Sequence, residues 1–319
     1  MITPCTARLH RLTSSTYAYL HPNGSWGRSN CGLIMSLSEG VLVDTQFTIP
    51  LTKKLIYSLS TVLPGMTVGT VINTHADGDH CWGNELFTGA VIIGSEATVR
   101  SMADEISPHE FMALMSATPP ETPLGGYLRR YFGDFDFSGI TVQPPTRVFT
   151  NELELRVGAS TVIKLVMVGP AHTDGDVIVH VPDEGVVFAG DILFIGDHPV
   201  MWSGPISNWI VACTRILESG AQTIVPGHGA VTDAAGVARF RDYLEYLSEQ
   251  AAVRYDAGMP YWQAALDIPM TSYADWGHRE RLVITVAGIY RELGLNEPFD
   301  IRTVMDRTAQ AFVELNVGP

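Results

Sequence analysis

The chain has 319 residues, of which 46% are hydrophobic and 17% charged, as in ordinary globular proteins, and this length allows one or two domains. Its formal net charge of −14 should repel phosphate backbones, so we expect no nucleic-acid partner. Residues 1–11 carry no long apolar stretch, and the sequence has no apolar stretch of about 18 residues and no basic cluster, so we expect no secretory leader and a cytoplasmic protein without membrane contact. The four cysteines form no CxxC pair, which indicates reduced thiols.

Strands and helices alternate in the first hundred residues. Apolar runs bounded by turn residues predict strands over 5–20, 31–35, 40–44, 68–73 and 91–94. The second and third of these strands read as a hairpin with its turn near Ser38. Helices are expected over 51–63, near Trp82, and from Ser95 onward. This succession predicts an α/β layered core.

Residues 101–140 interrupt the alternation, because they are rich in methionine, proline and aromatic side chains. Two interpretations stay open. The segment is either a helical excursion that packs on itself or a lid-like insertion that covers an apolar substrate.

The second half of the chain returns to strands and then becomes helical. Strands are expected near Val142 and over 147–149, 153–155, 162–168, 177–181, 186–191 and 223–225, with a helix over 209–219. From Ala235 to about residue 316 the pattern is mostly helical. We expect a catalytic domain over 1–250 and a helical C-terminal extension over 251–319, which covers the core, lines the pocket or forms a homodimer face.

Four stretches carry residues that can bind a metal. The run Thr74–His80 contains two histidines and two aspartates directly after an apolar strand, whereas a simple turn would use Asp and Gly without needing two histidines. Three later residues also follow apolar strands beside a glycine, where strand ends converge at one edge of a sheet. The candidate ligands are His75, Asp77, Asp79, His80, His172, Asp191 and His228.

This ordered set resembles the metallo-β-lactamase superfamily, whose pattern is His-x-His-x-Asp-His followed by a His, an Asp and a His at strand ends. The run Val41–Thr45 also resembles the family's early strand, and the match covers roughly residues 10–250. The resemblance implies a four-layer αβ/βα sandwich with a two-metal site. One ion would be held by His75, residue 77 and His172, the other by Asp79, His80 and His228, and Asp191 would bridge them.

Residue 77 departs from the family pattern, because Asp77 stands where the family has His. A third carboxylate makes the cluster one unit less positive and so weakens it as a Lewis acid. An oxygen ligand also moves metal preference toward Mn or Fe, although zinc is the family's usual metal. We expect two divalent metal ions, zinc before Mn or Fe; the alternative is that Asp77 leaves its own site weak and one ion binds tightly.

The implied chemistry is hydrolysis. Two ions ~3.5–4 Å apart can share a hydroxide that attacks a carbonyl carbon, while Asp79 orients the water or accepts its proton. The run Gly78–Asn84, the loop 169–174 and the helical C-terminus resemble the polyketide cyclase/thioesterase-like branch, and the wider group contains lactonases. We therefore expect a metal-dependent hydrolase of an ester, thioester or lactone of an apolar or aromatic small molecule. The alternative is a polyketide-type cyclase that uses the metals as Lewis acids for aldol ring closure. A flavodiiron-like redox module is disfavoured, since no stretch is free to form a flavin domain.

Other side chains are candidates for contact with a substrate. His198 lies in a loop seven residues after Asp191, and Trp202 follows it closely. Tyr127 and Tyr131 come from the 101–140 segment, and Trp26 from an early Gly/Ser/Asn loop. For each, packing in the core is the competing role, because aromatic side chains dominate protein interiors.

Overall fold

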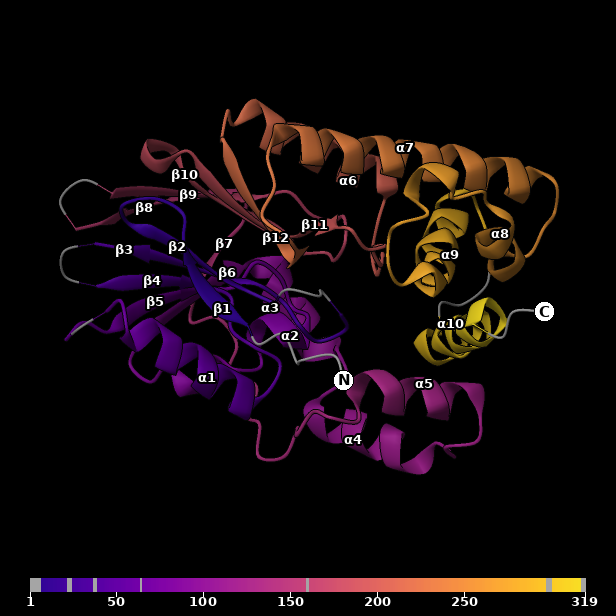
Figure 1. Cartoon of the computed structure of the whole chain (residues 1–319), viewed down its shortest axis with the longest axis horizontal. Coiled ribbons are helices and arrows are strands. Elements are labelled where there is room, and N and C mark those ends of the chain that lie inside the picture. The colour runs from indigo at the N-terminus through magenta and orange to yellow at the C-terminus, as the bar shows by residue number, and fades with distance from the viewer. Residues whose placement is uncertain are drawn as a thin grey trace.

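The computed structural model describes residues 7–21, 25–36, 39–63, 65–158, 161–296 and 300–316. Two β-sheets face each other in it, with helices on their outer faces and a group of helices at one end (Figure 1). The first sheet consists of β1 (Arg8–Arg11), β2 (Thr16–Leu20), β3 (Cys31–Met35), β4 (Gly40–Val43), β5 (Val68–Ile72), β6 (Val91–Ser95) and β7 (Arg147–Phe149), in that order. The second follows the order β12 (Thr223–Gly229), β11 (Val186–Ile195), β10 (Val177–Val181), β9 (Thr161–Met167) and β8 (Glu152–Val157).

The helices are named here in chain order. They are α1 (Ile49–Ser60), α2 (Gly78–Cys81), α3 (Glu96–Asp104), α4 (Pro108–Ala117), α5 (Pro123–Phe132), α6 (Ile206–Glu218), α7 (Ala234–Asp256), α8 (Tyr261–Asp267), α9 (Leu282–Glu292) and α10 (Ile301–Asn316). None of those described is long and apolar enough to cross a membrane.

The sandwich follows from the apolar faces of its strands. β4, β5, β6 and β7 are parallel, so both faces of this part of the sheet need cover. On the inner face, Val41, Ile72 and Ile93 pack against Val179 and Phe188 of the second sheet. On the outer face, Leu33, Leu42 and Val71 pack against Leu55 and Leu59 of α1. Helices α6 and α7 cover the second sheet through Trp209 and Phe240. The expected αβ/βα layering is confirmed.

The insertion and the C-terminal helices meet each other. Helix α10 contacts both α5 and α9, and lies between them in Figure 1. Ala309 of α10 is buried in a cluster with Tyr127 and Leu128 of α5, and the same cluster includes Phe47 and Trp82 beside the first sheet. The insertion therefore does not pack on itself alone. It joins the loops of the first sheet to the C-terminal helix.

Some predicted elements are wrong in position. The strand expected over 5–20 is instead two antiparallel strands, β1 and β2, because Thr13 Oγ1 accepts the Thr16 N–H at 3.1 Å and closes a turn between them. The expected hairpin of β3 and β4 is confirmed. Residues 5 and 6 and the predicted turn residue Ser38 lie outside the described part of the chain. Val142 is not in a strand, since side chains hold its neighbours: Glu85 accepts the Thr141 N–H, and Asn84 binds the Gln143 carbonyl.

The helix expected near Trp82 begins earlier, at Gly78. The division proposed at residue 250 falls within α7 and stays a prediction. Cys31, Cys81 and Cys213 are buried free thiols, as expected, and Cys5 lies outside the described residues.

Candidate metal centre

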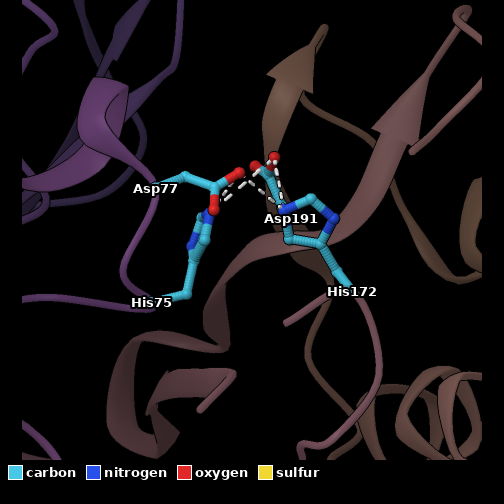
Figure 2. A group of neighbouring side chains, drawn as sticks. All are labelled: His75, Asp77, His172 and Asp191. Atoms are coloured by element: carbon cyan, nitrogen blue, oxygen red, sulfur yellow. Dashed lines mark hydrogen bonds and ion pairs between the residues drawn. The ribbon is translucent and has the colours of Figure 1, made fainter. Parts of the chain in front are cut away.

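All seven candidate ligands lie where the ends of the two sheets meet. His75 and Asp77 follow β5, Asp79 and His80 belong to α2, His172 follows β9, and β11 and β12 carry Asp191 and His228. Their ligand atoms form two groups, each within 4.8 Å: His75, Asp77, His172 and Asp191 in one, and Asp79, His80 and His228 in the other. Figure 2 shows the first group, with His75 and Asp77 facing His172 and Asp191 from the opposite side. The structure thus brings together every predicted ligand, in the grouping that the resemblance implied.

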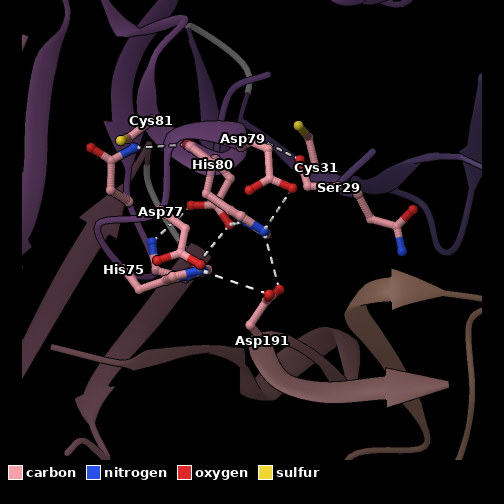
Figure 3. Close-up of polar contacts among 12 residues, drawn as sticks. Ser29, Cys31, His75, Asp77, Asp79, His80, Cys81 and Asp191 are labelled. Atoms are coloured by element: carbon pink, nitrogen blue, oxygen red, sulfur yellow. Dashed lines mark hydrogen bonds and ion pairs between the residues drawn. The ribbon is translucent and has the colours of Figure 1, made fainter. Parts of the chain in front are cut away.

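Asp191 contacts both groups, and Figure 3 shows it facing His75 and His80, with a dashed line to each. Its Oδ1 is 3.1 Å from His80 Nε2, and its Oδ2 is 3.3 Å from His228 Nε2 and 3.4 Å from His172 Nε2. One carboxylate therefore faces histidines of both groups, as a bridging ligand must.

Glycines allow the close approach of these strands. A Cβ at Gly227 would overlap Asp191 Oδ1, so no other residue fits at this point of β12 without moving Asp191. Gly190 has φ +52°, a conformation that glycine adopts at least cost.

Asp44 fixes the orientation of two of the histidines. Its Oδ1 accepts the Thr74 N–H at 2.7 Å, and its Oδ2 accepts the Thr74 hydroxyl at 2.7 Å and His80 Nδ1 at 2.9 Å. Because the Thr74 hydroxyl donates to this carboxylate, its oxygen is left to accept from His75 Nδ1 at 2.9 Å. Both Nδ1 atoms therefore carry hydrogen, which leaves each Nε2 lone pair facing the cluster.

His172 is fixed in the same way from the other sheet. Its Nδ1 donates to the Val200 carbonyl at 2.7 Å, so Nε2 again faces the cluster. This pattern, in which a backbone carbonyl or a carboxylate holds the outer nitrogen of a ligating imidazole, is typical of metal sites.

Several buried polar atoms at the centre have no hydrogen-bond partner within the described part of the chain. They are His75 Nε2, His80 Nε2, His228 Nδ1 and Asp191 Oδ1. Buried polar atoms are rarely left unpaired in native proteins. Imidazole lone pairs aimed at carboxylate oxygens repel them unless a cation or proton lies between. The donor set therefore fits divalent metal ions.

Without a cation, a protonated histidine balances part of the negative charge of the carboxylates at the site. Burial alone would lower the pKa of His172, but Asp77 and Asp191 beside it raise that pKa to about 10. Burial would raise the pKa of Asp77, but His172 brings it down to about 2. Burial lowers the pKa of His75 to about 3. Metal binding would thus displace a proton from His172, as ligation requires.

The predicted substrate residues fall into two places. Trp202 reaches the centre, because its indole Nε1 donates to Asp77 Oδ2 at 3.0 Å. Trp26 lies beside it with ring centroids 6.3 Å apart and donates from Nε1 to the Tyr127 hydroxyl at 2.7 Å. Tyr131 is next to Tyr127, with ring centroids 4.7 Å apart. These four aromatic side chains form a row that leads from the centre to the insertion.

His198 lies elsewhere. It is 1% exposed, its Nδ1 is 3.0 Å from the Tyr243 hydroxyl of α7, and its ring packs against Trp276. The structure shows a buried packing position, and its contact with substrate stays a prediction.

Sequence reasoning named Asp44 only as part of a family-like strand and gave it no role at the site. The available signal was its position directly after β4, the strand that neighbours β5 in the sheet. Asp44 also has φ +62°, which is rare outside glycine and often marks a functional position. Asn30 was missed as well; its side-chain amide donates to the carbonyls of Pro226 and Gly229 and so ties the first sheet to the His228 segment.

A two-sheet αβ/βα sandwich with a histidine and aspartate cluster at one end defines a class of metallohydrolases. Residues 24–228 match the family model of the metallo-beta-lactamase superfamily, and the chain belongs to this superfamily as a hydrolase. It is 21% identical over 216 residues to the acyl-coenzyme A thioesterase MBLAC2 of Gallus gallus, and this alignment covers 64% of this chain and 73% of that protein. The Homo sapiens protein of the same name is 22% identical over 218 residues, with 64% and 74% covered.

Solved structures show the same fold. A metallo-beta-lactamase from Pontibacter korlensis superimposes with a TM-score of 0.57 at 17% identity, covering 75% of this chain and 99% of its own. The DIM-1 metallo-beta-lactamase exposed to ceftazidime gives 0.54 at 17% identity, covering 75% and 96%.

Proposed function

We propose that this protein hydrolyses thioesters of apolar or aromatic acyl groups at a centre of two divalent metal ions. The observation that carries the proposal is the convergence of seven candidate ligand side chains, with the Nε2 atoms of His75, His80 and His172 lying 3.9, 3.1 and 3.4 Å from the carboxylate oxygens of Asp191. The curated relatives are named as acyl-coenzyme A thioesterases, and this favours a thioester over an oxygen ester or a lactone.

The residues of this chain would divide the work as follows. When bound, the ions supply an activated water and polarise the substrate carbonyl. Zinc fits the four histidines, whereas the oxygen of Asp77 moves preference toward Mn or Fe. Asp79 and Asp77 are the most accessible ligands, with 13% and 19% of their side chains exposed, so both face incoming substrate. We assign to Asp79 the orientation of the attacking water and the acceptance of its proton.

The aromatic row supports an apolar substrate. Trp26 and Trp202 are only partly buried, and Phe47, Trp82 and Phe132 continue the apolar surface behind them. Coenzyme A carries phosphate groups, which the net charge of −14 disfavours. We therefore expect the acyl group, rather than the nucleotide part of a carrier, to provide most of the recognition.

Elemental analysis followed by a matched substrate panel tests the proposal. The protein should contain transition metal near two equivalents, lose activity on chelation and regain it with Zn, Mn or Fe. The panel pairs coenzyme A thioesters with uncharged thioesters of the same acyl groups, together with lactones and aryl esters. Product mass separates the alternative, since hydrolysis adds water and aldol ring closure to an aromatic product loses it.

The variant that tests the centre is Asp191→Asn, which keeps the size of the side chain but removes the negative charge that faces both groups. It should lose metal and activity together. A purified protein that binds no Zn, Mn or Fe and hydrolyses no thioester would contradict the proposal. A small-molecule substrate, a cytoplasmic location and a homodimer through the C-terminal helices are proposed with it.

A further inference from the structure

The Asp77 side chain does not cap the helix at whose N-terminus it lies. It is the N-cap residue of α2, where an aspartate usually accepts a backbone N–H from the first turn, but its carboxylate makes no such bond. The side chain turns instead into the centre, where its Oδ2 lies 3.1 Å from His172 Nε2 and 3.8 Å from His75 Nε2. Something other than its own helix must therefore hold it.

Trp202 is placed to hold it. The backbone of this residue is fixed at two points, because its N–H donates to the His172 carbonyl at 2.9 Å and its carbonyl accepts from Arg291 Nη2 at 3.1 Å. Its indole Nε1 then reaches Asp77 Oδ2 at 3.0 Å. One residue thus contacts both His172 and Asp77, which come from opposite sheets.

The indole is the donor that remains to Asp77 once a metal ion is bound. Without metal, protonated His172 also donates from Nε2 to Asp77 Oδ2 at 3.1 Å. A metal-bound His172 keeps its hydrogen on Nδ1, which donates to Val200, and has none on Nε2 to give to Asp77. The Trp202 N–H carries its hydrogen at any pH and cannot ligate a metal. It occupies one lone pair of Oδ2 and draws electron density from an oxygen that brings extra negative charge to the cluster.

We propose that Trp202 is a positioning residue that lets Asp77 serve where the family has His. It aims the short carboxylate at the ion and offsets part of its additional charge. The assignment rests on the metal centre of the proposed function, and it gives Trp202 a role in addition to the substrate contact expected from the sequence.

The test is Co²⁺ titration of metal-free protein, followed by visible absorption and calorimetry, for the wild type and Trp202→Phe. Phenylalanine keeps an aromatic ring beside Trp26 but has no N–H. Loss of a hydrogen bond to a metal ligand typically weakens metal binding about 10–100-fold, and we expect this loss for the ion held with Asp77. The ion held by Asp79, His80 and His228 should keep its affinity, which shows that the variant is folded.

Two further variants separate the hydrogen bond from packing. Trp26→Phe alters the neighbouring ring and leaves the indole of Trp202 in place, so Co²⁺ affinity should stay within about threefold of the wild type. In an Asp77→His background the carboxylate is gone, and adding Trp202→Phe should cost no further affinity. The coupling between residues 77 and 202 is then the quantity measured by the double-mutant cycle.

The outcomes distinguish this assignment from the proposed function. A wild-type protein that binds no Co²⁺ contradicts the metal centre itself. Wild-type binding that Trp202→Phe leaves unchanged overturns the role of Trp202 alone. An equal loss in Trp26→Phe, or an undiminished effect of Trp202→Phe in the Asp77→His background, also overturns it, because packing would then explain the effect.

Discussion

Asp44 shows how a residue that binds no metal decides which atoms can bind one. Its Oδ2 accepts from Thr74 and from His80, and through Thr74 it also sets the tautomer of His75. Burial of this carboxylate is offset by three hydrogen bonds in which it is the acceptor. Two imidazoles of different groups thus depend on one side chain.

Asp44→Asn should weaken metal binding about 10–100-fold. An amide nitrogen in place of Oδ2 would donate toward His80 Nδ1, and this favours the tautomer whose Nε2 carries hydrogen and cannot ligate. Asparagine tolerates the left-handed backbone at φ +62°, so the change isolates the hydrogen bonds. Competition with a chromogenic chelator measures the affinity. Asp233→Asn, at the exposed N-cap of α7, is the matched control and should leave affinity unchanged.

His198 should make stability depend on pH. Burial and the nearby Arg279 lower its pKa from 6.5 to about 3, so the folded state keeps it neutral. Its contribution is fully present above pH 6.5 and is lost as pH falls from 6.5 toward 3, because only the unfolded chain takes up the proton. Between pH 7 and pH 5 this amounts to about 2 kcal/mol of unfolding free energy.

Urea unfolding at both pH values measures this contribution. His198→Asn keeps an acceptor near the Tyr243 hydroxyl but does not titrate. The wild type should therefore lose about 2 kcal/mol more than the variant between pH 7 and pH 5. Equal losses in the two proteins would show that His198 is protonated in the folded state.

The convergence of the seven candidate ligands could be predicted from the sequence because metal chemistry restricts residue type and strand ends restrict position. The hydrogen bonds behind them could not. The signal for Asp44 was only its place after β4, and no sequence pattern joins Trp202 to Asp77, which is 125 residues away along the chain.

At the scale of elements, part of the ligand-bearing run Thr74–His80 is helical, because α2 begins at Gly78. The sequence predicted a helix only near Trp82, but Gly78–Cys81 is helical and carries Asp79 and His80. A helix of this length shows no apolar period, so periodicity could not predict it. Placing His80 on it lets the His80 carbonyl accept from Thr45 and Asn73 while the ring faces Asp191.

The insertion and the C-terminal extension are joined through Tyr127. Its hydroxyl accepts from Trp26 Nε1 and donates to Glu280 Oε1 at 3.0 Å, and Glu280 is 4% exposed. Arg281, next to Glu280, lies over the Trp26 ring at 4.3 Å from its centroid. Three segments far apart in sequence thus share one polar contact inside an aromatic cluster.

Tyr127→Phe should destabilise the protein by roughly 1–3 kcal/mol, because it leaves the Trp26 N–H and the Glu280 carboxylate without this partner. Denaturant unfolding measures the loss. Tyr131→Phe is the matched control, since Tyr131 lies beside Tyr127 but is only partly buried, and it should cost less than about 0.5 kcal/mol. Similar losses in both variants would mean that the hydroxyl of Tyr127 carries no special weight.

At the scale of the whole molecule, the sandwich and its layers could be predicted, whereas the docking of the last helices could not. An amphipathic pattern such as that of α10 indicates that one face is buried but does not name its partner. That partner is α5, a helix of the 101–140 insertion. Whether the 101–140 insertion packs only on itself therefore could not be read from its own sequence, because it depends on the contact of α5 with α10 near the C-terminus.

Metal removal should lower the melting temperature. An ion that binds only the folded state stabilises it by about 2.7 kcal/mol at 100 times its dissociation constant, which corresponds to several degrees for a chain of this size. Calorimetry with and without chelator measures the shift, and readdition of Zn²⁺ should reverse it. In Asp191→Ala the chelator should have no effect; a shift of the same size there would place the stabilising ion elsewhere.

The division of the ligands between the two sheets also sets an order of events during synthesis. The first group needs Asp191 and the second needs His228, so neither is complete while only the first sheet has left the ribosome. More than a hundred residues must be synthesised after the first four candidate ligands before Asp191 and His228 are available; those four are His75, Asp77, Asp79 and His80. The first sheet therefore has to hold its own shape through the apolar contacts of β3, β4 and β5 with α1. Capture of the proposed metal ions would therefore come late, as a step that closes the molecule rather than one that starts its folding.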